Sequence, residues 1–62
     1  MQPLSRLKDY RKKRMLTQHE LAERSGVSRA TIARLEATDT RATPKTARKL
    51  AEALKVKPQT LM

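Results

Sequence analysis

The only glycine in this 62-residue chain, Gly26, separates two short stretches that both have the spacing of α-helices. Leu21 precedes it on the apolar face of one expected helix, and Ile32 and Leu35 follow it three positions apart on another. Glycine adopts a positive φ at little cost, so Gly26 is suited to end the first helix and reverse the chain. Residues 18–37 are therefore predicted to form two helices joined by a tight turn.

Helical spacing extends over the rest of the chain, and no run of residues reads as a β-strand. Thr17 and Glu20 have the spacing of a capping box, which starts a helix. Ser28 is a favourable N-cap, and Thr43-Pro44 combines a cap with a proline at the first helical position. The helices expected are residues 4–14 with Pro3 in the first turn, 17–25, 28–37, 43–54 and a short last turn over 57–61, with a polar loop over 38–42.

The fold class is accordingly predicted as all-α. We expect one domain over residues 1–62, a compact five-helix bundle in which the second and third helices form a helix-turn-helix. A core of this size leaves no face for a buried ligand pocket. The expected core residues are Leu4, Leu7, Leu16, Leu21, Ala22, Val27, Ile32, Leu35, Ala47, Leu50, Ala51, Leu54, Val56 and Leu61.

The charge of the chain favours a polyanionic partner. Fifteen lysines and arginines against six acidic residues give a formal net charge of +9 and a pI near 11.0. Such a surplus on a small domain is typical of nucleic-acid binding, although it also serves solubility or adhesion to any polyanion. The chain has no Trp or Phe and a single Tyr10, which disfavours single-strand binders and sheet-based RNA platforms, because both stack bases on aromatic side chains.

Other classes of function lack the residues that they require. There is no cysteine for a disulfide or a thiolate metal site, and His19 alone, expected on an exposed helix face, cannot build a zinc site. No nucleophile–base pair or acid pair is present, so we expect no enzyme activity, cofactor or metal. No apolar run approaches the roughly 18 residues of a membrane span, so we expect no membrane partner and a cytoplasmic, nucleoid-associated protein.

The outward face of residues 28–37 combines long donors with small side chains. Arg29 and Arg34 flank Ala30 and Ala33 on this face. Arginine can pair bidentately with guanine, and an alanine methyl can pack on the methyl group of thymine. We interpret the face as one that reads base edges, with an ordinary solvated helix face as the alternative.

Several short motifs stand in a fixed order along the chain. They are Arg11, then Leu16-Thr17-Gln18, Leu21-Ala22, Gly26-Val27-Ser28, Ile32-Ala33-Arg34-Leu35-Glu36 and finally Leu50-Ala51-Glu52-Ala53-Leu54-Lys55-Val56. In this combination the sequence resembles the phage repressor and Cro-type helix-turn-helix family, also called the XRE family. The resemblance covers essentially the whole chain and implies a lambda-repressor-like DNA-binding domain.

The resemblance implies roles for the positions that match the family motifs. It implies that helix 28–37 lies in the major groove of DNA. The residues implied to contact bases are Arg29, Ala30, Thr31 and Arg34, with phosphate as the alternative for Thr31 and Arg34. The residues implied to contact phosphates are Thr17, Gln18, Ser28, Thr38, Thr40 and Arg41. Arg11 and Glu36 are implied to form a structural ion pair.

Three positions depart from the family pattern. The family usually has a glycine soon after the third helix, where this chain has Thr38, and another before the final valine, where it has Lys55. We therefore expect either strained helix caps at these two positions or a different end to the third helix. Asp39 places a negative charge in a loop that should face phosphate. The basic run 11–14 either contacts flanking phosphate or ends a helix in solvent.

The function predicted from these features is a sequence-specific, double-stranded DNA-binding transcription regulator, and specifically a repressor. Domains of this kind read two half-sites about one helical turn apart, so we expect a homodimer on an inverted-repeat operator. The alternative is a protein-interaction module, such as the antitoxin of a toxin–antitoxin pair, with a toxin or co-regulator as its protein partner. Both alternatives stay open because a fold does not determine its function.

Overall fold

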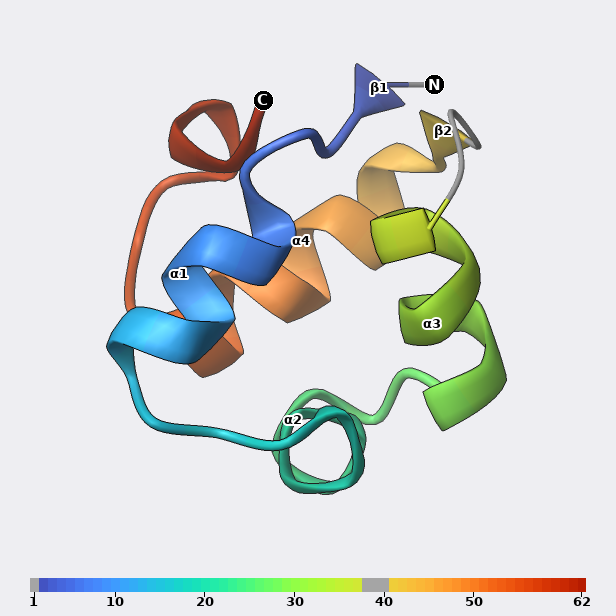
Figure 1. The fold of residues 1–62 in the computed structure, drawn as a ribbon. Coiled ribbons are helices and arrows are strands. Elements are labelled where there is room, and N and C mark those ends of the chain that lie inside the picture. Colours follow the sequence, from blue (N-terminus) through green and yellow to red (C-terminus); the bar gives the residue numbers. More distant parts are fainter. Residues whose placement is uncertain (1, 38–40) are drawn as a thin grey trace.

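The structure is a computed structural model of the chain, and it describes residues 2–37 and 41–62. Over these ranges the chain forms four α-helices, one 3-10 helix and two short β-strands around a common core (Figure 1). In chain order the elements are β1 (Gln2–Pro3), α1 (Leu7–Lys13), α2 (Gln18–Ser25), α3 (Arg29–Ala37), β2 (Arg41–Ala42), α4 (Pro44–Leu54) and the 3-10 helix η1 (Pro58–Leu61).

The prediction of a fifth α-helix is wrong. The last segment, η1, is a four-residue 3-10 helix, so the described residues contain four α-helices. Its backbone bonds span three residues, from Thr60 N–H to the Lys57 carbonyl at 2.9 Å and from Met62 N–H to the Gln59 carbonyl at 3.2 Å. A segment this short favours the tighter 3-10 turn over a full α-helical turn.

The first helix is shorter than predicted. It begins at Leu7, and Pro3 lies in β1 instead of in the first helical turn. β1 runs antiparallel to β2, with Gln2 opposite Ala42 and Pro3 opposite Arg41. This two-residue pairing was not predicted from the sequence, but the all-helical class of the fold is confirmed. The polar loop expected over residues 38–42 ends in β2.

Long-range contacts keep the N-terminal segment out of the first helix. Leu4 is buried in the core, and the N–H of Arg6 donates to the carbonyl of Leu61 at 2.8 Å. The N–H of Leu7 donates to the Leu4 carbonyl at 3.1 Å, a three-residue turn, and the α-helix begins only at Leu7. The partner at Leu61 lies at the other end of the chain, where local spacing gives no signal.

The signals that start α2 and α4 are confirmed. Thr17 and Glu20 form a complete capping box, in which each side chain accepts a hydrogen bond from the backbone N–H of the other. Thr43 caps α4 by accepting from the N–H of Thr46, and Pro44 occupies the first helical position. Because caps involve residues three apart, a sequence displays them directly.

Three helices are followed, within two residues of their ends, by a residue with left-handed backbone geometry. The expected Gly26 ends α2 at φ 75°. Met15 follows α1 at φ 57°, and Lys55 follows α4 at φ 58°. After α4, the N–H of Lys55 donates to the carbonyl of Glu52 and that of Val56 to the carbonyl of Ala51, which is the Schellman arrangement normally built with glycine. The strained cap expected at Lys55 is therefore present.

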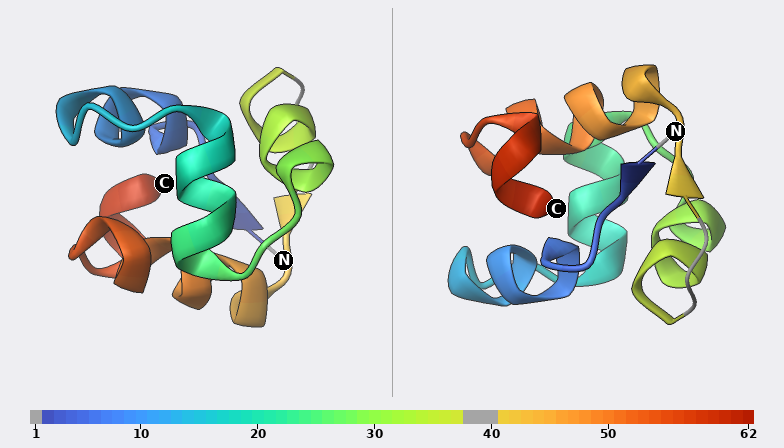
Figure 2. Two further views of the ribbon diagram at one scale, coloured as in Figure 1. Left: turned by 90° about the horizontal axis from the view of Figure 1, so that it is seen from below. Right: turned by 90° about the horizontal axis from the view of Figure 1, so that it is seen from above.

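The core lies where the helices converge. α2 packs against both α3 and α4, α1 contacts α3, and η1 closes over α4 (Figure 2). Ala22 and Val56, predicted to be core residues, are only partly buried, whereas Ala42 is 3% exposed and was not predicted, because it belongs to the unexpected strand β2. The buried apolar side chains are Leu4, Leu7, Leu16, Leu21, Val27, Ile32, Leu35, Ala42, Ala47, Leu50, Ala51, Leu54 and Leu61.

Candidate nucleic-acid interface

α3 is fixed to the core along one side and open along the other. Ile32 is fully buried and Leu35 is 5% exposed, and these side chains anchor the helix. Ala33, expected to point away from the core, is half-buried. The four residues predicted to contact bases lie on the remaining surface of the helix, exposed except for the half-buried Thr31: Arg29, Ala30, Thr31 and Arg34.

Two hydroxyl groups organise the start of α3. The Ser28 hydroxyl accepts from the backbone N–H of Thr31 at 3.2 Å and donates to the Thr31 hydroxyl oxygen at 2.8 Å. Ser28 therefore caps the helix, which begins at Arg29. Because the Thr31 hydroxyl oxygen accepts from Ser28, its own O–H can donate to a base or a phosphate.

The start of α2 lies beside the last turn of α3. The Gln18 amide nitrogen donates to Glu36 Oε1 at 3.1 Å, which joins the two helices at this end. Thr17 precedes Gln18 as the cap of α2, and its hydroxyl oxygen is already an acceptor for the Glu20 N–H. A helix N-terminus favours anions, and both residues were predicted to contact phosphate. Each keeps an N–H or O–H that can donate to one.

Arg11 and Glu36 form a bidentate ion pair between α1 and α3. Arg11 Nε lies 2.7 Å from Glu36 Oε2, and Arg11 Nη2 lies 3.0 Å from Glu36 Oε1. The third arm of the guanidinium, Nη1, donates to the Leu16 carbonyl at 2.7 Å. The side chains are 10% and 3% exposed. The structure thus brings together the two residues that the family resemblance pairs.

The ionisation of this pair follows from its surroundings. Burial acts to raise the pKa of Glu36, but hydrogen bonds from Arg11 and Gln18 outweigh it and hold that pKa below its ordinary value. The hydrogen bond to Glu36 raises the pKa of Arg11. Both groups are therefore charged at neutral pH, and the pair holds α3 against α1 while Gln18 ties in α2.

Sequence reasoning did not identify the contacts of Gln18 with Glu36 or of Arg11 with the Leu16 carbonyl. Gln18 and Glu36 are 18 positions apart, and their contact depends on how α2 and α3 pack. The phosphate contact expected of Gln18 uses the same amide group, whose second N–H is available for it.

Part of the predicted site lies outside the described residues. Thr38 and Thr40 lie outside the described residues, as does the acidic Asp39. The backbone of Arg41 belongs to β2, but its side chain lies outside the described part of the structure. The described interface therefore consists of α3 and the start of α2.

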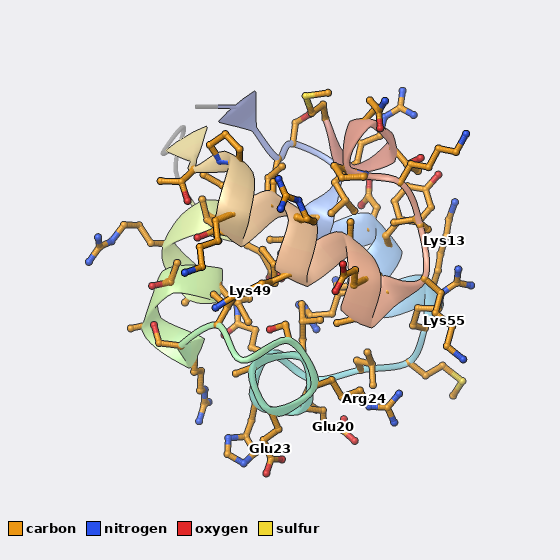
Figure 3. All side chains as sticks on the ribbon, turned by 180° about the vertical axis from the view of Figure 1, so that it is seen from behind. Lys13, Glu20, Glu23, Arg24, Lys49 and Lys55 are labelled. Atoms are coloured by element: carbon orange, nitrogen blue, oxygen red, sulfur yellow. The ribbon has the colours of Figure 1, made fainter. Side chains whose placement is uncertain are left out.

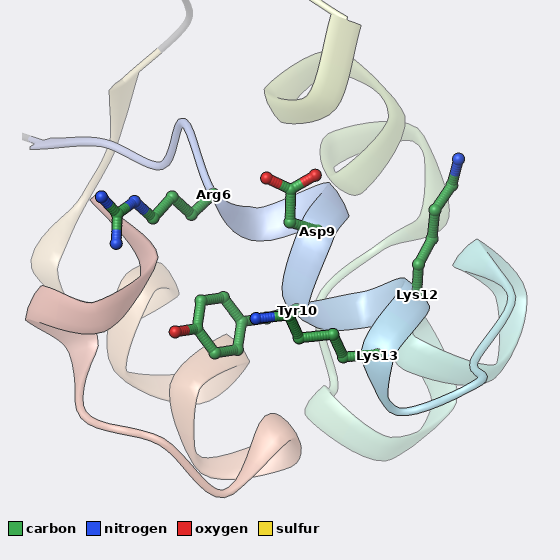
Figure 4. Close-up of a pocket in the computed structure, with 5 residues that line it drawn as sticks. All are labelled: Arg6, Asp9, Tyr10, Lys12 and Lys13. Carbon is green, nitrogen blue, oxygen red and sulfur yellow. The ribbon is translucent and has the colours of Figure 1, made fainter.

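The basic run 11–14 is divided between internal and surface roles. Arg11 is buried, and Arg14 Nε donates to the carbonyl of Leu54 at 2.9 Å, at the end of α4. Lys13 Nζ lies 4.7 Å from the centre of the Tyr10 ring, a cation–π contact, and Lys12 is exposed. Lys12, Lys13 and Tyr10 border an open hollow on α1 together with Arg6 and Asp9 (Figure 4).

Other kinds of site receive no support from the described residues. They contain no group of three or more His, Asp or Glu side chains placed to hold a metal ion. The side chain of His19 is 64% exposed, and its Nε2 lies 3.4 Å from Glu23 Oε1 on the same helix. In the described part of the chain, none of the helices has the length and apolar character needed to cross a membrane.

Comparisons with known proteins agree with this geometry. The helix-turn-helix family model HTH_3 matches residues 7–61. The structure is similar to the crystal structure of the restriction-modification controller protein C.AhdI from Aeromonas hydrophila, with a TM-score of 0.85, 32% sequence identity, and coverage of 92% of this chain and 86% of that chain. No curated protein sequence matches the chain. With nearly the whole chain matched, this protein belongs to the XRE-type helix-turn-helix family of DNA-binding regulators.

Proposed function

We propose that this protein is a sequence-specific transcription repressor that reads double-stranded DNA with α3 in the major groove. The observation that carries the proposal is the division of α3 into a buried side, anchored by Ile32 and Leu35, and an open side. The major groove is about 12 Å wide and admits one helix. Arg29, the first residue of α3, stands where recognition helices meet base edges.

The open side of α3 has the chemistry of direct readout. Arg29 can donate two hydrogen bonds to O6 and N7 of one guanine, and the methyl group of Ala30 can pack against a thymine methyl. Thr31 and Arg34 extend the surface to a further base or to the flanking phosphate. The small side chain at position 30 lets the helix approach the floor of the groove, which a long side chain would obstruct.

Phosphate contacts would set the position of α3 on the duplex. Thr17, Gln18 and Ser28 stand at the starts of α2 and α3, where backbone N–H groups and the helix dipoles favour anions. We propose that Thr38, Thr40 and Arg41 also contact phosphate, as the family resemblance implies. Contacts of this kind provide affinity and register but no sequence information.

One helix reads only a few base pairs, so we propose that two chains act as a homodimer on an inverted repeat. The resemblance to a restriction-modification controller protein supports a regulatory role. In this proposal the 62 residues form a single DNA-binding domain of a nucleoid-associated protein.

Selection of binding sites from random DNA duplexes tests the proposal, with the selection run at two salt concentrations. We expect an inverted-repeat consensus with half-sites spaced by about 10 base pairs, and weaker binding at higher salt with the same consensus. Uniform weak binding without a consensus would contradict sequence-specific reading. Such a result would favour the protein-interaction role, which co-purification of a partner would then establish.

A further inference from the structure

α4 carries a second basic face that the helix-turn-helix does not use. One side of α4 is buried through Ala47, Leu50, Ala51 and Leu54. Four exposed charged side chains lie along the opposite side: Lys45, Arg48, Lys49 and Glu52. The last three follow Lys45 by three, four and seven residues, which places all four on one face of the helix. Three of these four are basic, and the exposed Lys55 follows directly after the helix.

This face is separate from the open side of α3. Seen from behind, α4 lies nearest the viewer, with Lys49 on it and Lys55 just beyond its end, while α3 forms one edge of the molecule (Figure 3). In this view α4 faces the viewer and the outer side of α3 faces the edge of the molecule.

The cations of this face are not engaged within the described structure. Lys45, Arg48 and Lys49 make no hydrogen bond or ion pair with the described residues. Lys45 has like charges three and four residues away, and like charges at these spacings repel one another along a helix. Glu52 offsets only part of this repulsion. A bound polyanion would remove it, whereas nothing in the described fold does.

The composition of the face favours DNA over an acidic protein. Protein interfaces are centred on large apolar or aromatic anchors. The exposed large hydrophobic residues in the described chain are Met15 and Met62, and neither belongs to α4. Basic side chains spread along a helix, without an apolar anchor, match instead the closely spaced charges of a phosphate backbone.

We propose that the α4 face binds the phosphate backbone of a second DNA segment, so that one chain holds two segments together. The interaction is independent of sequence, because phosphates carry no base information. It goes beyond the operator reading proposed above and does not rest on it, because two duplexes of any sequence suffice to detect it.

A capture assay tests this proposal. The protein is bound to an immobilised duplex, and a labelled second duplex of unrelated sequence is added at about 50 mM salt. The readout is the amount of labelled duplex retained per amount of protein bound. Wild-type protein should retain the label. The variant Arg48→Gln/Lys49→Gln should retain at least fivefold less, and the slope of log retention against log salt should become shallower by about 2. The control Arg6→Gln/Lys57→Gln removes two exposed charges elsewhere and should behave as wild type.

Three results would overturn the proposal. Unchanged retention by the α4 variant would show that the second duplex binds elsewhere, for example to a second recognition helix in a dimer. Equal loss by the control would reduce the effect to net charge. If the α4 variant lost binding to poly-glutamate but still retained the second duplex, the face would be assigned to an acidic protein. A selection experiment that yields no consensus contradicts the repressor proposal alone, because this assay does not depend on a selected sequence.

Discussion

Lys55 has the backbone conformation of a glycine while carrying a long side chain. Its φ and ψ of 58° and 43° lie in the left-handed region, which costs a residue with a Cβ about 1–2 kcal/mol. Lys55→Gly should relieve this strain, and the greater freedom of glycine in the unfolded chain offsets part of the gain. We expect a rise of about 1 kcal/mol in the free energy of unfolding, measured by urea denaturation.

Glu52→Gly is the matched control for this prediction. Glu52 is exposed within α4, where helical φ gives glycine no advantage. The control should lower the free energy of unfolding by about 1 kcal/mol. A loss of stability in both variants would contradict the left-handed cap at Lys55.

At the scale of the helices, the pair formed by Arg11 and Glu36 is the main polar link between α1 and α3. Arg11→Met would leave the Glu36 carboxylate nearly buried without its cation, at a cost of about 3–5 kcal/mol. Because a domain of this size is marginally stable, the variant should be largely unfolded by circular dichroism at 25 °C. The neighbouring Lys12→Met, on an exposed site, should change stability by less than about 0.5 kcal/mol.

A second substitution separates the ion pair from simple packing. Arg11→Met/Glu36→Leu removes both charges, and an apolar pair of similar volume is often as stable as a buried ion pair. We expect the double variant to recover most of the helical signal. If it is as unfolded as Arg11→Met, the unpaired carboxylate is not the cause of the loss.

The lowered pKa of Glu36 makes the fold sensitive to acid. Such a carboxyl group stabilises the fold at any pH above its pKa in the unfolded state. This contribution is lost as the pH falls through its lower pKa in the folded state. Stability should therefore decline as the pH falls below about 4.5. In Glu36→Gln the decline should be shallower, as thermal unfolding between pH 3 and pH 6 (roughly the range that brackets a carboxyl titration) would show. An identical decline in Glu36→Gln would assign the acid sensitivity to other carboxylates.

The sequence predicts elements well where the signals are local. The caps at Thr17, Ser28 and Thr43 and the turn at Gly26 involve residues within three or four positions. The starts of α2, α3 and α4 and the end of α2 follow from them. The start of α1 could not be predicted in this way, because the segment before it packs Leu4 into the core and bonds Arg6 to the distant Leu61 carbonyl. For the same reason the pairing of β1 with β2 leaves no trace in local spacing.

The candidate site divides along the same line. Helical periodicity alone predicts that Arg29, Ala30 and Arg34 are exposed on α3, although Ala33, expected beside them, is half-buried. The pairing of Arg11 with Glu36 required a family resemblance. The amide of Gln18 was assigned to phosphate, and its bond to Glu36 emerges only from the packing of α2 on α3.

For the molecule as a whole, phosphate contacts and base contacts should separate under salt. Arg41 is proposed to contact phosphate, so Arg41→Gln should weaken binding to all duplexes alike and make the slope of log affinity against log salt shallower by about 1. Fluorescence anisotropy on a selected duplex and on a scrambled one measures both effects. A loss confined to the selected duplex would instead place Arg41 at a base.

The central claim is that α3 reads base sequence, and Arg29 tests it most directly. Binding-site selection with wild type and with Arg29→Ala, followed by affinity measurements on the wild-type consensus, compares the two proteins base by base. We predict that Arg29→Ala binds the consensus about 1–3 kcal/mol more weakly and loses preference at one base position in each half-site, while the other positions are retained. An unchanged affinity with an unchanged consensus would contradict the placement of α3 in the major groove.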